Sequence, residues 1–243
     1  MPMNNRLLRP LATSRFASLR VGLVAYWPLN EDAESGDVTA VDWTGRGNDL
    51  TSNNSVLSTL GKIGNARQFA AVNSEFLSIA SNADVQFGES AWTIALWFYV
   101  PSAATGQMAL FGKDIAGGRE FECSYNRVAN TLEVVPYDSD GIGINLSIGS
   151  VSRDEWHFLC VRHEDVSPTF YAHLDGIEYS ASRGEGVTFN TTSTEFRVGA
   201  RIYSGFFNYL TGNIDEVAKW SRSLSAEEVA ALYNNGNGID LRK

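Results

Sequence analysis

The stretch Trp92-Thr93-Ile94-Ala95-Leu96-Trp97-Phe98-Tyr99-Val100 is apolar at almost every position and is followed by Pro101. β-Branched and aromatic residues at this density favour an extended strand, and the lack of polar alternation indicates that both faces are buried. A proline has no N–H to give to a sheet, so the strand should end there. Residues 92–100 therefore predict a central strand of a sheet.

A second stretch predicts how neighbouring strands are joined. The alternating segments 169–174 and 177–180 flank Asp175-Gly176. Such a link is a strong hairpin signal, because a type I′ turn requires positive φ at both of its central residues. Similar short apolar segments, separated by turn residues, begin at Val21 and continue toward the C-terminus. Strands at this spacing without intervening helices predict an all-β fold, a sandwich of two antiparallel sheets.

One short helix is predicted near the C-terminus. Ser225 and Glu228 have the spacing of a capping box, in which side chain and backbone of the two residues satisfy each other. Asn234-Asn235-Gly236 supplies residues that accept the left-handed conformation at which helices end. We expect this helix to pack on the edge of the sandwich.

The composition fits a single globular domain. With 44% hydrophobic and 19% charged residues among 243, the chain can fill a core and carries too little charge to be disordered. Cys123 and Cys160 lie in apolar strand-like segments, so we expect two buried thiols, with a single disulfide as the alternative. We find no signal peptide and no segment long enough for membrane insertion.

Charge is distributed unevenly along the chain. Residues 1–20 carry four arginines and no acid, a net of +4, whereas the remainder holds 15 Lys/Arg against 28 Asp/Glu, a net of −13. An acidic body argues against nucleic-acid binding, which needs basic surface to neutralise phosphates. We predict residues 21–243 as the folded domain and residues 1–20 as a basic arm. The arm is either a poorly ordered terminus or a docking segment that acts through Arg6, Arg9, Arg15 and Arg20.

A series of short segments resembles laminin-G-like domains of the concanavalin A-like lectin/glucanase kind. Each match is weak alone, but together they follow the family's order over about residues 21–236. The resemblance implies a jelly-roll sandwich with one short C-terminal helix. The matching segments are 22–31, 42–50, 64–69, 92–97, 156–158, 175–176, 214–217 and 224–229.

The resemblance also implies a structural Ca²⁺ ion where the first and last strands meet. Carboxylate and amide oxygens are suitable ligands for this ion. One ligand position holds an asparagine where the family more often has an acid, which removes a charge. The alternative is a solvated acidic loop whose Asp and Asn residues form turns. The residues at the family's ligand positions are Asn30, Glu31, Asp42, Asn48 and Asp215.

An aromatic segment near residue 206, which we expect to form a loop, predicts a recognition surface. It has four aromatic residues within seven positions, and Trp43 lies in the loop that begins at Asp42. Exposed rings can stack on a sugar or become buried against a protein partner. The alternative is that the segment folds over the sandwich and fills the edge of its core. The four aromatic residues are Tyr203, Phe206, Phe207 and Tyr209.

We do not expect catalysis. Glycoside hydrolysis needs two carboxylates that face each other across a groove. Glu120 and Glu122 alternate on one strand face, but the further acid of a glucanase-type segment is missing. The three histidines have no metal-site spacing, and we find no nucleophile motif and no phosphate-binding glycine loop.

Together these features predict a non-enzymatic structural or adhesion protein. Our first hypothesis is a phage virion component (a capsid decoration, fibre-associated or tail adhesin protein) that the arm docks to other virion proteins within an oligomeric assembly. The alternative is a calcium-dependent carbohydrate-binding or adhesion module of a cell-surface or secreted protein. The lack of a recognisable signal peptide favours the virion. A glycan or host-surface ligand is compatible with both.

Overall fold

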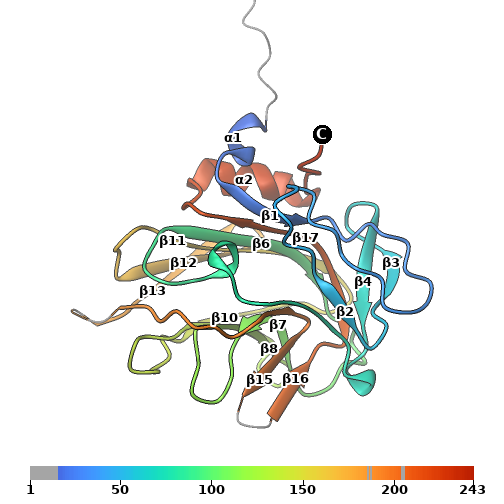
Figure 1. Cartoon of the computed structure of the whole chain (residues 1–243), viewed down its shortest axis with the longest axis horizontal. Helices are drawn as coiled ribbons and strands as arrows, with labels where there is room; N and C mark the ends of the chain where they lie inside the picture. Colours follow the sequence, from blue (N-terminus) through green and yellow to red (C-terminus); the bar gives the residue numbers. More distant parts are fainter. Residues whose placement is uncertain (1–15, 185, 187, 204–205) are drawn as a thin grey trace, which may run out of the picture.

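The computed structural model describes residues 16–184, 186, 188–203 and 206–243, and shows two antiparallel sheets stacked face to face (Figure 1). One sheet has eight strands, with β1 (Leu23–Trp27) paired to β17 beside the main path. The order along that path is β13 (Ile177–Ser182), β12 (Thr169–Leu174), β11 (Trp156–His163), β6 (Trp92–Tyr99), β17 (Gly212–Trp220), β4 (Asn65–Phe69) and β3 (Leu57–Leu60).

The second sheet has seven strands and lies below the first in Figure 1. A separate two-stranded hairpin, β15 (Ala200–Tyr203) and β16 (Phe206–Tyr209), packs against β7 of this sheet. The order in the seven-stranded sheet is β10 (Leu146–Ile148), β9 (Thr131–Pro136), β8 (Phe121–Asn126), β7 (Gln107–Lys113), β14 (Phe196–Val198), β5 (Phe76–Ile79) and β2 (Thr51–Asn53).

The local predictions for strands and turns are confirmed. β6 is buried along nearly its whole length and has neighbours on both sides, β11 and β17, as expected of a central strand. Asp175 and Gly176 have φ values of 51° and 85°, so the link between β12 and β13 has the positive φ angles that a type I′ turn requires. The chain therefore forms the predicted all-β sandwich.

The main core lies between the two sheets. Inward side chains from both sheets form one continuous apolar cluster, which includes Trp27, Leu96, Phe111 and Val161. Cys123 and Cys160 are both buried and unpaired, as free thiols. Burial raises the pKa of each thiol well above its usual range, because a thiolate would lose its hydration.

A second apolar cluster lies on the outer face of the eight-stranded sheet, beneath two helices (Figure 1). Helix α2 (Ala226–Tyr233) has the predicted capping box: the Glu228 N–H donates to the Ser225 hydroxyl, and the Glu228 carboxylate accepts from the Ser225 N–H. Its Leu232 and Val229 are buried against the sheet. Short 3₁₀ turns occur at η1 (Ala71–Asn73), η2 (Ala83–Val85) and η3 (Asn234–Gly236).

The described end of the predicted arm belongs to this second cluster. Helix α1 (Ala17–Arg20) places Leu19 against the sheet with 1% exposure, and Phe16 packs beside it. The Trp220 indole N–H donates to the Leu19 carbonyl at 2.6 Å. The packed body therefore includes residues 16–20, which the sequence assigned to the arm. A four-residue helix with one buried leucine has too short a pattern to be recognised as part of a core.

None of the helices in the described part of the chain combines the length and the hydropathy needed to cross a membrane.

Candidate functional site

The aromatic segment predicted as a loop is the β15–β16 hairpin. Its register pairs Ile202 with Phe207 and Arg201 with Asn208. Because side chains alternate across a strand, the first pair lies on one face of the hairpin and the second pair on the other. The two faces differ in chemistry, and each has a distinct role in the site.

The face that carries Phe207 is an aromatic platform, by which we mean Phe76, Phe207 and Tyr209. The Phe207 and Tyr209 rings are stacked, with centroids 5.5 Å apart and planes 7° from parallel. Phe76 of β5 supports Tyr209 from 6.2 Å. Phe207 is 50% exposed. The platform thus offers flat apolar surface to solvent, which is suited to the apolar face of a sugar or to a partner's side chains.

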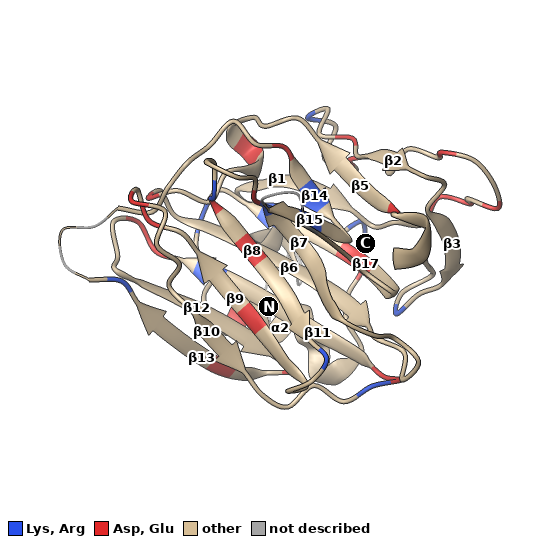
Figure 2. Cartoon of the chain, turned by 90° about the horizontal axis from the view of Figure 1, so that it is seen from below, with Lys and Arg blue, Asp and Glu red and all other residues tan. Residues whose placement is uncertain are grey.

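The opposite face of the hairpin packs onto a charged cluster, defined as Asp114, Arg119, Glu122 and Arg201. Arg201 pairs with Glu122 and lies 4.0 Å from Asp114. Arg119 reaches the same two carboxylates, at 3.1 Å to Asp114 and 3.2 Å to Glu122. Figure 2, seen from the side of the seven-stranded sheet, shows acidic segments on β8 and β9 and basic ones on β14 and β15. Opposite charges therefore join the hairpin to the sheet.

Two tyrosines complete this junction. The Arg119 guanidinium lies between the Tyr137 and Tyr203 rings, 3.7 Å and 4.1 Å from their centroids. On the next strand the Asn208 amide donates to the Gln107 carbonyl at 3.0 Å, which ties β16 to β7. Guanidinium–ring contacts and paired charges inside a partly dry junction restrict movement of the hairpin. The aromatic platform is consequently held at a fixed position.

The structure separates the predicted ligand residues. Phe207 and Tyr209 lie on the aromatic platform, whereas Tyr203 faces the charged cluster. Phe206 forms part of β16, but its side chain lies outside the described part of the structure. Trp43 is 42% exposed and contacts Tyr26 edge-on, on the outer side of the other sheet. It is not part of the hairpin surface.

The predicted docking arginines are only partly described. Arg20 donates to the Leu241 carbonyl at 3.0 Å and lies 5.4 Å from the Trp43 ring. Both contacts are within the body, while Arg20 itself remains exposed, so its docking role stays a prediction. Arg6, Arg9 and Arg15 lie outside the described residues.

The residues implied as calcium ligands separate into different environments. The Asp42 carboxylate accepts hydrogen bonds from the backbone N–H groups of Tyr26 (3.1 Å), Thr44 (3.0 Å) and Asn48 (3.2 Å). The Asn48 amide oxygen accepts from Asn82 at 3.0 Å. These oxygens are already used to hold the 42–48 loop in its turn, which is the alternative that the sequence left open.

The other three residues lie around a different turn. The Asn30 amide oxygen accepts from the Asn65 N–H (2.8 Å), and Asp215 Oδ2 accepts from the Ile63 N–H (2.9 Å). Glu31 pairs with the buried Arg67 at 3.2 Å. The second oxygen of Asp215 is buried without a partner, and burial raises the pKa of this carboxyl to about 7.

A single calcium ion does not fit this arrangement. Ca²⁺ needs six to eight oxygens converging at about 2.3–2.6 Å, and most of the oxygens here accept protein hydrogen bonds at two separate turns. Within the described ranges, no set of three or more His, Cys, Asp or Glu side chains is arranged to hold a metal ion. Burial instead favours the neutral, protonated form of the Asp215 carboxyl, because a carboxylate there would lose its hydration.

Sequence reasoning did not find the charged cluster. Its members come from β8, β15 and the connection between β7 and β8, so no single segment carries a recognisable pattern. The one available signal was the alternation of Glu120 and Glu122. From the sequence we expect these two residues to lie on one strand face. In the structure they have separate partners: Glu120 pairs with the buried Lys113, and Glu122 pairs with the arginines of the charged cluster.

Comparison with solved structures shows where this architecture recurs. The binding domain of Paraclostridial mosquitocidal protein 1 has a TM-score of 0.73 and 15% identity, over 90% of this chain and 53% of that one. Domain 4 of an extracellular arabinanase from Geobacillus stearothermophilus, solved with arabinotriose, has a TM-score of 0.54 and 16% identity, over 89% and 98%. A sialidase of Trypanosoma rangeli has a TM-score of 0.63 and 14% identity, over 90% and 34%.

At these sequence identities, the likeness between the structures shows the fold alone. The chain spans about half the length of the mosquitocidal binding domain. No curated protein matches the sequence. The family model for the concanavalin A-like lectin/glucanases superfamily matches residues 73–230, which is more than half of the chain. The matched segment includes the central strand β6, its neighbour β11 and most of α2. The two-sheet architecture and this match together show that the chain belongs to the concanavalin A-like lectin/glucanases superfamily.

Proposed function

We propose that the chain is a non-catalytic recognition module that binds a glycan on the aromatic platform. The observation that carries this proposal is the stacked Phe207–Tyr209 pair, in which Phe207 is half exposed, on a hairpin fixed to the sheet by the charged cluster. A rigid platform loses little conformational entropy on binding, so stacking energy is retained as affinity. The fold it shares with binding domains of toxins and with an arabinanase domain supports a binding role.

The carboxylates near the platform support binding rather than hydrolysis. Asp114 and Glu122 each contact Arg119, and Glu122 also contacts Arg201. A hydrolase acid has to deliver a proton to the leaving group, and its partner has to reach the sugar or a water molecule. Carboxylates engaged by two arginines in a partly buried junction are suited to neither task.

A glycan array followed by titration tests this function. We expect the wild type to bind a defined set of glycans, and Phe207→Ala to weaken binding by about threefold to tenfold, the loss of one ring stack. Leu60→Ala is the matched control, because Leu60 is 82% exposed on β3, outside the platform. No glycan binding by the wild type, or equal affinity in Phe207→Ala, would overturn the proposal.

A virion is our proposed setting for this module, with a cell-surface or secreted protein as the alternative. The supporting observation is the charge distribution: the first 20 residues carry only basic charge, and the remainder has a net of −13. We propose that the four arginines of this segment, Arg6, Arg9, Arg15 and Arg20, dock on an acidic partner. Changing all four to alanine should reduce incorporation into particles. Normal incorporation of the variant would favour the surface or secreted alternative.

A further inference from the structure

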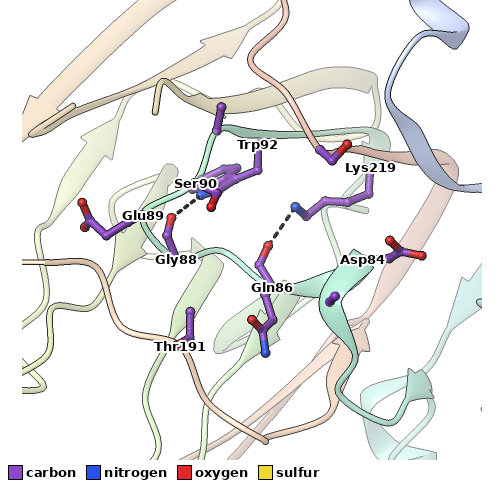
Figure 3. Close-up of a pocket in the computed structure, with 11 residues that line it drawn as sticks. Asp84, Gln86, Gly88, Glu89, Ser90, Trp92, Thr191 and Lys219 are labelled. Carbon is purple, nitrogen blue, oxygen red and sulfur yellow. Dashed lines mark hydrogen bonds between the residues drawn. The ribbon is translucent and has the colours of Figure 1, made fainter. Parts of the chain in front are cut away.

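A cavity of about 310 Å³ opens beside the segment that crosses from one sheet to the other, between β5 and β6 (Figure 3). Its lining comes from residues 83–92 together with Thr191, Lys219 and Ser221, and includes no residue of the β15–β16 hairpin. The segment is well anchored: the Trp92 indole N–H donates to the Gly88 carbonyl at 3.1 Å. A Cβ on Gly88 would come within 2.3 Å of the Thr191 methyl group, so this close approach requires glycine. The cavity is therefore a defined part of the fold.

Lys219 is an inward-facing lysine on a central strand. Its neighbours in register, Ile94 and Ala25, both belong to the main core. The side chain is only 3% exposed, and its amine lies 4.6 Å from the Phe87 ring and 5.4 Å from the Trp92 ring. An apolar residue at this position would complete the core at no cost in desolvation, whereas a buried ammonium is expensive.

The Lys219 amine has no ionic partner. It donates to the Gln86 carbonyl at 2.9 Å, and among the described residues no carboxylate lies within salt-bridge distance of it. Figure 3 shows the side chain extending toward the middle of the cavity. Desolvation lowers the pKa of Lys219 to about 7, as expected for a cation without a counter-ion.

The acidic groups around the cavity are occupied by other cations. Asp84 pairs with Arg46 at 2.9 Å, and Glu89 pairs with Arg183 at 2.8 Å. The charges that act on Lys219 are those of Asp84 and, deeper in the molecule, of Glu120 and Lys113, which pair with each other at 3.4 Å. Each of these carboxylates thus has a cation at salt-bridge distance, whereas Lys219 has no carboxylate at that distance within the described part of the chain.

We propose that this cavity is a second binding site, which takes a small hydroxylated carboxylate of monosaccharide size, such as a uronic acid, and pairs its carboxylate with Lys219. The volume lies at the lower end of the range for small-molecule pockets, about 300–1,000 Å³. A single ammonium matches a monoanion, whereas phosphate usually requires a guanidinium fork or several backbone N–H groups. Ser90, Thr191 and Ser221 supply hydroxyls for the sugar's own hydroxyl groups.

Binding of the carboxylate must be linked to protonation of Lys219. The anion pairs with the ammonium and not with the neutral amine, so it raises the pKa of Lys219 when it binds. Affinity for the carboxylate is therefore highest below the pKa of Lys219 in the free protein, and it falls as the pH rises above that value. Asp84, Glu89, Glu120 and Lys113 face the same region, and each of these groups has an ion-pair partner of its own.

The experiment is a titration of the full chain with D-glucuronate and, as the uncharged match, D-glucose. We expect glucuronate but not glucose to bind at about pH 6, with affinity at least about tenfold lower at about pH 9. Lys219→Met should abolish binding, because it keeps the length of the side chain and removes the charge. Lys243→Met is the control, since Lys243 is 81% exposed at the C-terminus.

Two results would overturn the proposal: no binding of glucuronate to the wild type at about pH 6, or equal affinity in Lys219→Met. If Lys219→Met fails to fold, the pH dependence of the wild type still decides, because binding that is unchanged up to about pH 9 excludes the ammonium as the partner. Phe207→Ala should bind glucuronate normally. That variant separates this site from the aromatic platform, so either proposal can fail alone.

Discussion

The two sheets of the sandwich are covered on their outer faces in opposite ways. Helices α1 and α2 close the outer face of the eight-stranded sheet with apolar contacts, in which Leu19, Trp220 and Leu232 are buried. The hairpin that covers the seven-stranded sheet is joined to it by arginines and carboxylates and leaves Phe207 exposed. The first arrangement stabilises the fold by burying apolar side chains, and it leaves few of them exposed for a ligand to contact. The second retains chemical groups at the surface and fixes their positions, which suits recognition.

The largest expected difference concerns stability. Trp220 is fully buried beneath α1, so Trp220→Ala should lower the free energy of unfolding by about 3–5 kcal/mol. Phe207→Ala, on the exposed side of the hairpin, should change it by about 0.5 kcal/mol or less. Urea denaturation of both variants measures the contrast. Equal losses would show that the hairpin face is as much a part of the core as the helical face.

A smaller effect is expected at the charged cluster. Arg201→Met leaves Glu122 and Asp114 with Arg119 as their remaining cation, and should cost about 1–3 kcal/mol. Arg46→Met breaks the exposed Arg46–Asp84 pair and should change the free energy of unfolding much less, because solvent screens this pair. Hydrogen exchange of the β15–β16 amides should accelerate in Arg201→Met alone. Unchanged exchange would mean that the hairpin is held by its apolar contacts.

The helical face contains a buried acid with a pH-dependent effect. Tyr26 donates to Glu216, and burial raises the pKa of Glu216 from 4.5 to about 9. The folded state therefore binds more protons than the unfolded state between these values, and the free energy of unfolding falls as pH rises through this window. Glu216→Gln should reduce the fall, part of which belongs to Asp215, with a gain of at least about 1 kcal/mol at about pH 9 and little change at about pH 4.

Thermal melting of both proteins across this window measures the effect. Glu34→Gln is the control, because Glu34 is exposed in the acidic loop before β2. A gain that is independent of pH would mean that Glu216 acts through packing and that its ionisation in the fold costs little.

The smallest expected effect is that of calcium removal. The resemblance implies that a chelator lowers the melting temperature, whereas the hydrogen bonds to Asp42, Asn30 and Asp215 predict no change. Melting with and without chelator, together with elemental analysis, decides between them. A chelator-dependent loss that Asp215→Ala abolishes would restore the calcium ion and require these turns to rearrange around it.

What could be predicted depended on the range of each interaction. Segments 92–100 and 169–180 carried their own strand and turn signals, and Ser225 with Glu228 carried the helix start, because each of these acts between residues close in sequence. The hairpin was predicted as a loop because its strands are short and its aromatic residues do not follow a regular two-residue alternation. The charged cluster had no such signal, since Glu122 and Arg201 meet only when β8 and β15 have folded together.

The bulge in β17 shows why the sites needed the tertiary structure. By the two-residue period of a strand, Ile214 facing the core would place Trp220 inside and Lys219 outside. Glu216 instead has a φ of 53°, and the register with β6 shifts between Asp215 and Ala218. The shift reverses the alternation, so that Trp220 lies beneath α1 and Lys219 extends toward the cavity.

The sequence by itself determined the class of fold, the central strands, the hairpin turn and the capped helix. Only the tertiary structure decided which polar side chains are buried, which of them are paired, and that no carboxylate of the described residues lies within salt-bridge distance of Lys219. The physical reason is that hydrophobic periodicity and turn preferences act locally along the chain, whereas the burial and pairing of a charge depend on groups brought together from distant segments.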